Sequence, residues 1–168
     1  EAFIKSLYAV GYPREIKSIL LSVGRAYDKG AMLGAMRTFH AYGIKLYATA
    51  GTYAFLTENN VPATLALWPN ADDNKPSPPA DAVQAIDLIA QSKGGVAGGG
   101  VNLVINIPSP RKVDEVTNGY AIRRAAVDYG VTLVTNRQIA ERLAEAVESS
   151  REGRDGDADL TPESWREY

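Results

Sequence analysis

The chain has 168 residues, a formal net charge of −2 and no cysteine. Its 45% hydrophobic and 23% charged residues are typical of a globular domain that is long enough to bury a core. The small net charge gives no indication of a nucleic-acid-binding surface, and no apolar run approaches the roughly 20 residues that span a membrane. The lack of cysteine excludes disulfides, thiolate metal sites and cysteine nucleophiles, and we expect a protein of the reducing cytoplasm.

Short apolar runs of strand length alternate along the chain with segments of helical spacing. The expected strands are 17–23, 44–48, 62–67, 101–107 and 131–134. The expected helices are 1–10, 28–42, 53–59, a segment after Asp81, 118–129 and a segment after Thr135. Because strands and helices alternate, we predict a three-layer α/β fold in which helices cover both faces of a five-stranded parallel sheet.

Local signals in the sequence predict where some of the helices begin and end. Asp81 and Thr135 are each followed three residues later by glutamine, which is the spacing of a capping box. The helix at 118–129 is expected to turn Tyr129 toward the core, and Gly130 then ends it.

Several segments have no apolar pattern and are expected to be loops. They are 68–80 with four prolines, the glycine-rich break 92–100, the segment 108–116 and a polar tail from 149 onward. The glycine-rich break lacks the strand–glycine–helix context of a dinucleotide site, so we interpret it as a plain turn.

Polar residues follow three of the expected strands. They are Ser22 after the first strand, residues 49–52 after the second and residues 106–109 after the fourth. Ligands of parallel sheets bind beyond the carboxyl ends of the strands, so these residues are expected to converge.

The segment KLYATAGTYAF, residues 45–55, reads as a strand that passes through a tight turn into a short helix. Free N–H groups and the helix dipole at such a turn favour an anion. The alternative is a plain helix cap, because threonine is a good capping residue and glycine is common in turns.

Four segments in order resemble a known family: ILLSVGRAYDK, LYATAGTYAFL, NLVINIPSP and YAIRRAAVDYGVTLVTN. Together they are similar to the C-terminal allosteric domain of the large subunit of carbamoyl phosphate synthetase, which has the methylglyoxal-synthase-like fold. The resemblance covers about residues 14–148. Residues 1–13 resemble the end of the preceding synthetase region, so we expect a fragment of a longer chain, with residues 149–168 as its polar tail.

The resemblance implies a pocket for an anionic effector, which is UMP, UTP or IMP in glutamine-using synthetases and N-acetylglutamate in the ammonia-using relative, with ornithine acting nearby. The implied contacts, together with the Gly51 amide suggested by the turn itself, are Ser22, Lys29, Thr49, Gly51, Thr52, Trp68, Asn106, Ser109 and Asn118. Trp68 matches a tryptophan that lines the pocket in the acetylglutamate-binding relative. The loop after Asn106 departs from the family pattern. Ser109 and Asn118 therefore match the family's ligand contacts less closely than the other residues do.

The resemblance also implies a context for the domain. The parent enzyme would use ATP, Mg²⁺, bicarbonate and glutamine or ammonia in pyrimidine and arginine synthesis. Its partners would be the rest of the large chain and the glutaminase subunit, with self-association possible. We expect no catalytic residue, metal or cofactor in this domain, and no nucleic-acid or membrane partner.

Two alternatives belong to other classes. Methylglyoxal synthase, a lyase, needs a carboxylate base and a histidine acid at strand ends. Here Asp72 and Asp73 lie in the proline-rich segment, and His40 lies late in a helix. A ligand-free docking module would show an apolar surface patch. Arg123 and Arg124 are interpreted as ion-pairing residues on a helix surface or as contacts with the rest of the synthetase, and the alternative is that they bind phosphate.

Overall fold

The structure is a computed structural model that describes residues 6, 9, 11–13, 15–68, 77–92, 99–109 and 113–151. The strands are β1 (Ser18–Val23), β2 (Lys45–Thr49), β3 (Thr64–Leu67), β4 (Val83–Gln84), β5 (Leu103–Ile107) and β6 (Thr132–Val134). The helices are α2 (Ala26–Ala41), α3 (Ala50–Glu58), α4 (Ala85–Ala90), α5 (Val113–Asp128) and α6 (Arg137–Arg151).

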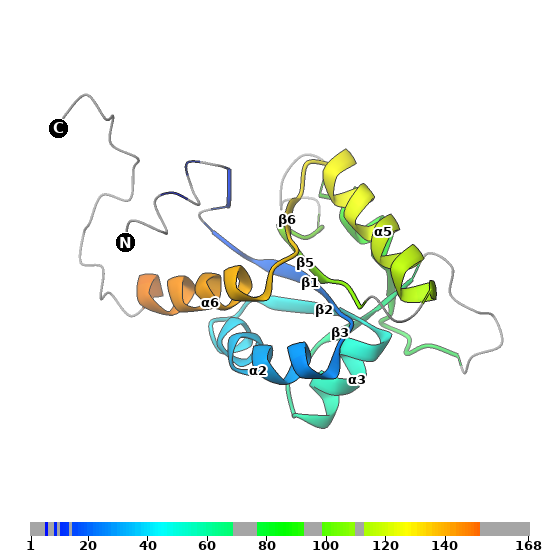
Figure 1. The fold of residues 1–168 in the computed structure, drawn as a ribbon, viewed down its shortest axis with the longest axis horizontal. Helices are drawn as coiled ribbons and strands as arrows, with labels where there is room; N and C mark the ends of the chain where they lie inside the picture. The colour runs from blue at the N-terminus through cyan, green and yellow to red at the C-terminus, as the bar shows by residue number, and fades with distance from the viewer. Residues whose placement is uncertain are drawn as a thin grey trace.

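The strands form one parallel sheet in the order β4-β3-β2-β1-β5-β6. The chain moves outward from β1 to β4 and then returns to place β5 on the other side of β1 (Figure 1). The order therefore reverses between β1 and β5, and such a switch point leaves a crevice at the carboxyl ends of the strands.

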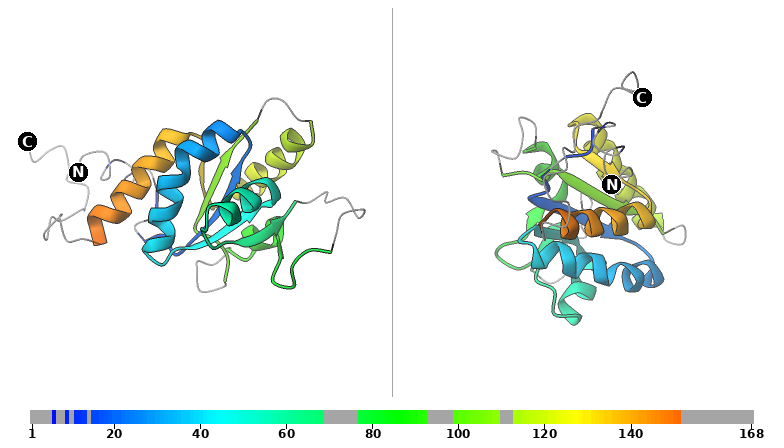
Figure 2. Two further views of the ribbon diagram at one scale, coloured as in Figure 1. Left: turned by 90° about the horizontal axis from the view of Figure 1, so that it is seen from below. Right: turned by 90° about the vertical axis from the view of Figure 1, so that its left-hand side faces the viewer.

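Helices cover both faces of the sheet, which confirms the three-layer α/β prediction. Along β1, Ile19 and Leu21 pack with Phe39 of α2 and Leu143 of α6, whereas Leu20 packs on the other face among residues of α4 and α5. Figure 2 shows α2 and α6 side by side on one face of the sheet. This alternation is the period-two pattern of a strand that is buried on both faces.

The sheet has six strands and not the predicted five, because the sequence pattern did not reveal β4. Val83 and Gln84 pair with Ala66 and Leu67 at the edge of the sheet. Gln84 is the N-cap of α4 and makes no side-chain capping bond, so the predicted capping box from Asp81 is wrong. The sheet edge offers backbone partners that the local sequence pattern does not reveal.

Helix α5 begins at Val113, so the loop predicted for 108–116 is partly helix and the predicted start at 118 is wrong. Among the side chains of α5 that the structure describes, the buried apolar ones begin at Ile122, where the predicted pattern lies. Tyr129 follows the end of this helix and is 37% exposed, so its predicted inward position is also wrong.

Helix α6 is capped by Asn136 rather than by Thr135. The Ile139 N–H donates to Asn136 Oδ1 over 3.2 Å, which is the expected bond from an N-cap side chain to the third helical residue. The helix continues to Arg151, past the predicted domain end at 148.

Some predictions fall outside the described residues. They concern most of the helix at 1–10, residues 69–76 of the proline-rich loop, residues 93–98 of the glycine-rich break and the tail from 152. Within the described ranges, no helix has both the length and the hydropathy that are needed to cross a bilayer.

Candidate functional site

A small cavity of about 40 Å³ lies where β1, β2, β3 and β5 end. Its walls come from the ends of these strands and from the first turns of α2 and α3. The lining residues are Ser22, Val23, Gly24, Lys29, Thr49, Gly51, Thr52, Trp68, Asn106, Ile107, Pro108 and Ser109. All of the residues predicted from the sequence except Asn118 are in this set, and whether they bind an anion stays a prediction.

Strand register places three polar side chains in a row across the sheet. Ser22 is level with Asn106 of β5, and Thr49 follows Ala48, which is level with Leu21. The Thr49 and Ser22 hydroxyl oxygens are 3.3 Å apart, and all three polar side chains are buried. A row of hydroxyl and amide groups thus replaces the core side chains that fill this face two residues earlier in each strand, which are Leu20, Tyr47 and Val104.

The start of α3 is not closed by a side chain. Thr49 is the N-cap residue but makes no capping bond, since its hydroxyl is directed to Ser22. Gly51 and Thr52 are in the first turn of α3, where backbone N–H groups have no partner within the helix. The interpretation of Thr49 as a plain cap is therefore not supported, and the positive end of the helix dipole lies at the cavity.

Thr52 has a different role from the one expected. Its Oγ1 accepts the Val23 N–H over 2.9 Å and donates to the Val23 carbonyl over 3.3 Å, and the residue is only 1% exposed. A hydroxyl has a single proton to donate, so Thr52 could donate to an anion only by releasing Val23. Its side chain ties β1 to α3 and fixes the cavity wall.

Replacing Thr52 with valine is therefore expected to reduce the free energy of unfolding by about 1–2 kcal/mol, because the buried Val23 N–H loses its acceptor. Chemical denaturation of the two proteins measures this loss. Thr57→Val is a matched control, since the Thr57 hydroxyl donates only to Tyr53 of its own helix at an exposed position. A Thr52→Val protein as stable as the control would contradict the structural role.

Lys29 brings a cation to the cavity from the α2 face of the sheet. It lies in the first turn of α2, and its Nζ donates to the Gly51 carbonyl over 2.8 Å. A Cβ placed on Gly51 would lie 3.3 Å from this Nζ, so glycine at that position leaves room for the ammonium.

Trp68 follows β3 and forms part of the wall. Its indole Nε1 is buried and has no hydrogen-bond partner among the described residues. A buried N–H without an acceptor is costly, and a ligand oxygen in the cavity would satisfy it.

The Asn106 amide is hydrogen-bonded by a residue of α5 that the sequence did not assign to the site. Arg123 of α5 donates from Nη1 to Asn106 Oδ1 over 2.6 Å. Gly119, one turn earlier on α5, was the available signal, because helix positions four apart share a face and glycine permits a close approach. Asn118 is buried on the same helix but does not line the cavity.

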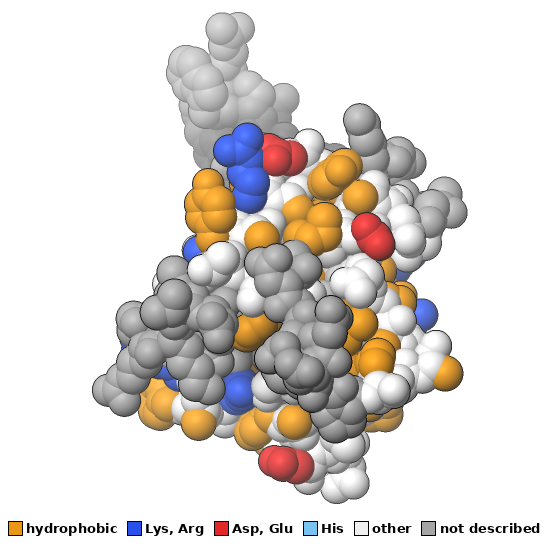
Figure 3. Space-filling model, turned by 90° about the vertical axis from the view of Figure 1, so that its right-hand side faces the viewer, with side chains coloured by type: hydrophobic (Ala, Val, Ile, Leu, Met, Phe, Trp, Pro, Cys, Tyr) orange, Lys and Arg blue, Asp and Glu red, His pale blue; other side chains and the backbone are white. Residues whose placement is uncertain are grey.

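The lining residues that the structure describes combine hydrogen-bond donors with a single cation and include neither Asp nor Glu. On the described part of the side where the strands end, lysine and arginine atoms are scattered rather than gathered into one patch (Figure 3). Selectivity for an anion would therefore arise within the cavity and not from a broad surface field.

The histidine required by the lyase alternative is elsewhere. His40 lies near the end of α2 and lines a groove with Lys45 and Thr64, at the amino ends of β2 and β3. This is the opposite edge of the sheet from the cavity. Asp72 and Asp73 are outside the described residues, and the described residues contain no cluster of three or more His, Asp or Glu side chains that could hold a metal ion.

Comparison with known proteins agrees with the fold. A family model described as "MGS-like domain" matches residues 31–135, and the chain belongs to this family. Over 89% of its length the chain is 35% identical to "Carbamoyl-phosphate synthase [ammonia], mitochondrial" of Mus musculus, and it covers 9% of that protein. It is 36% identical to "Multifunctional protein URA2" of Saccharomyces cerevisiae over 88% of the chain and 6% of the relative. The chain thus spans less than a tenth of the length of these relatives.

Proposed function

We propose that this domain binds a small anionic effector in the cavity and thereby regulates carbamoyl phosphate synthesis by a longer chain. The observation that carries the proposal is the set of donors in the lining: Ser22, Thr49, Asn106, Trp68 and Lys29 can all donate, and none of the described lining residues carries a carboxylate. The relatives named carbamoyl-phosphate synthase support the second part.

The arrangement suits reversible binding better than turnover. Phosphate and carboxylate groups are held by preorganised N–H and O–H donors together with a cation. General acid–base chemistry needs a titratable pair within reach of the substrate, and the described part of the cavity lining offers only Lys29.

An effector bound here would touch several elements at once. Contacts to β1, β2, β5 and the first turns of α2 and α3 would favour whichever arrangement of these elements best closes around the ligand. An effector can then shift the parent enzyme between states only by its difference in affinity for them. In this proposal ATP, Mg²⁺, bicarbonate and the nitrogen donor act elsewhere in the longer chain, and the glutaminase subunit is a partner of that chain.

Two effector classes remain candidates. Trp68 favours N-acetylglutamate, because its indole lines the cavity and carries an N–H with no acceptor among the described residues, which an acyl oxygen could supply. A nucleotide such as UMP or IMP would place its phosphate against the same donors. The cytoplasmic location also stays a prediction, and the mouse and human relatives are named as mitochondrial.

Thermal unfolding with UMP, UTP, IMP, ornithine and N-acetylglutamate in turn tests the proposal. A ligand at about 100 times its dissociation constant adds roughly 2.7 kcal/mol of stability. For a chain of this size the midpoint should rise by roughly 5 °C or more. Formation of methylglyoxal from added triose phosphate would replace regulation with the lyase alternative.

A docking role is the second candidate, and one observation favours it. Tyr120 and Val127 lie seven residues apart on α5, and their side chains are 61% and 68% exposed. They share one side of the helix and are large apolar groups in water. If none of the five compounds moves the midpoint, this interpretation gains and effector binding is contradicted.

A further inference from the structure

The contact between Arg123 and Asn106 determines which atoms of the Asn106 amide are available to a ligand. The bond between Arg123 Nη1 and Asn106 Oδ1 is 2.6 Å long and half-buried, and Asn106 itself is 1% exposed. An arginine can only donate, so the amide atom that faces it must be the oxygen. The Asn106 Nδ2 hydrogens are then the groups that remain for the cavity.

The orientation matters because an amide presents opposite polarity on its two sides. With Oδ1 held by Arg123, Asn106 presents donors to an anion. If the amide rotated by half a turn, it would present a carbonyl oxygen, which repels an anion. A free asparagine could adopt both orientations, and a charged donor behind it strongly favours one.

Gly119 makes this contact possible. A Cβ on Gly119 would lie 3.2 Å from Arg123 Nη1 and 3.6 Å from both Asn106 amide atoms. The absence of a side chain at this position lets α5 approach β5 closely enough for the guanidinium to reach Asn106.

We propose that Arg123 is a positioning residue that fixes the Asn106 amide with its N–H groups toward the cavity, so that Arg123 sets anion affinity without touching the anion. The inference rests on the proposed function, because the cavity must bind an anion for affinity to be affected. Arg123 is not among the residues that line the cavity, so its influence passes through Asn106.

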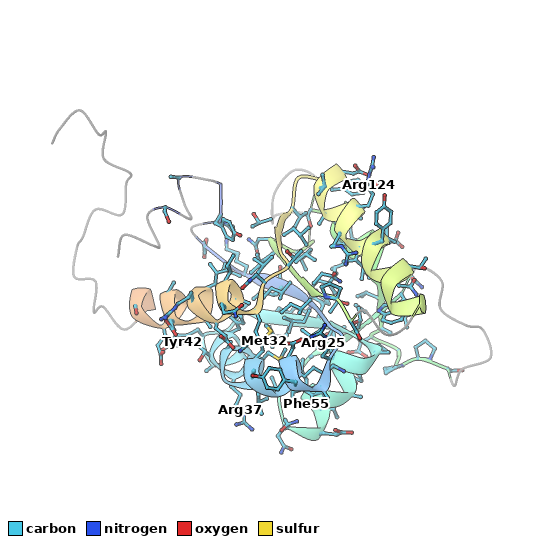
Figure 4. All side chains as sticks on the ribbon, viewed as in Figure 1. Arg25, Met32, Arg37, Tyr42, Phe55 and Arg124 are labelled. Atoms are coloured by element: carbon cyan, nitrogen blue, oxygen red, sulfur yellow. The ribbon has the colours of Figure 1, made fainter. Side chains whose placement is uncertain are left out.

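The neighbouring Arg124 supplies a matched control. It is on the same helix and carries the same charge, but it donates to both carboxylate oxygens of Asp128 over 2.8–2.9 Å. The hydrogen bond and charge of Asp128 raise the pKa of Arg124 further above its ordinary value. Its side chain points away from the sheet (Figure 4). Replacing it removes one positive charge and leaves Asn106 untouched.

The first experiment is a double-mutant cycle on the chain, with UMP, IMP and N-acetylglutamate each titrated by calorimetry. Arg123→Met should weaken binding about tenfold, and Arg124→Met should change it by less than about twofold. In an Asn106→Ala background, Arg123→Met should have no further effect, because its only route to the ligand is gone. Arg123→Lys keeps the charge and one donor, and it should recover part of the affinity.

An equal loss from Arg123→Met in both backgrounds would overturn the positioning role and leave the proposed function standing. Equal losses from Arg123→Met and Arg124→Met would also overturn it, since they would indicate a general charge effect. Asn106→Asp is a further check: its carboxylate should keep the Arg123 contact and the fold, yet lose binding because it no longer donates.

The second readout needs no ligand. In a nitrogen-edited proton spectrum, the Asn106 side-chain NH₂ pair, assigned by its absence in Asn106→Asp, should shift and exchange faster in Arg123→Met but not in Arg124→Met. An unchanged Asn106 pair in Arg123→Met would overturn the inference by itself. If this pair responds as expected and wild type binds none of the probes, the proposed function fails and the orientation of Asn106 stands.

Discussion

Replacing Lys29 with methionine is expected to weaken anion binding by about 10- to 100-fold and to remove most of the thermal shift. The Nζ of Lys29 reaches the first turn of α3, where it donates to Gly51, and among the described residues that line the cavity Lys29 is the only cation. A hydrogen bond to a charged group contributes about 1.5–3 kcal/mol, which corresponds to this change in affinity. Calorimetric titration with UMP and with N-acetylglutamate measures it.

Lys45→Met is the control for Lys29. Lys45 is exposed at the beginning of β2, the same strand that ends at the cavity with Thr49, and its ammonium lies over the Tyr47 ring. The Lys45→Met substitution removes an equal charge from the other edge of the sheet, so we expect little change in anion affinity at physiological salt. Equal losses from both variants would show that Lys29 acts through overall charge and not through a contact in the cavity.

Replacing Gly24 with alanine is expected to give the largest loss of folding stability, about 2–3 kcal/mol, together with loss of anion binding. A Cβ on Gly24 would lie 2.5 Å from the Ser109 Cβ and 2.7 Å from the Ser109 backbone nitrogen. A rotamer change cannot relieve a clash with backbone, so either the end of β1 or the segment after β5 must move. Both segments line the cavity, and the Gly24 N–H donates to the Ile107 carbonyl across the same gap.

Denaturant unfolding of Gly24→Ala beside Gly34→Ala separates this close approach from the general effect of glycine. Gly34 is within α2, and a Cβ there would meet no atom within 4 Å. Alanine favours a helix over glycine by about 1 kcal/mol, so Gly34→Ala should be neutral or stabilising. A Gly24→Ala protein of unchanged stability would contradict the packing that the structure shows between β1 and the segment after β5.

Much of the candidate site followed from simple periodicity. Buried runs that alternate with helices predict a parallel sheet, and a parallel sheet brings all carboxyl strand ends to one edge. Ser22, Thr49 and Asn106 are polar residues at the ends of three such runs, so their convergence could be predicted before any coordinates were known. Lys29 was implied by the resemblance of its segment to the family and not by periodicity.

Local signals failed where distant segments supply the partner. The predicted cap at Asp81 is replaced by strand pairing with β3, and α5 begins at Val113 and not at the predicted residue 118. The Thr52 hydroxyl was expected to face a ligand, yet it bonds the Val23 backbone. Arg123 was interpreted as a surface ion-pairing residue, yet it bonds Asn106.

The sequence by itself determined the α/β class and the edge of the sheet at which the polar strand ends converge. Those features depend on residue type and on periods of two and 3.6, which are local properties of a chain. Only the tertiary structure decided the register that aligns Ser22 with Asn106, the partner that occupies each hydroxyl and the orientation of the Asn106 amide. These depend on distances between residues far apart in the chain, and a hydrogen bond is made or lost within a few tenths of an ångström.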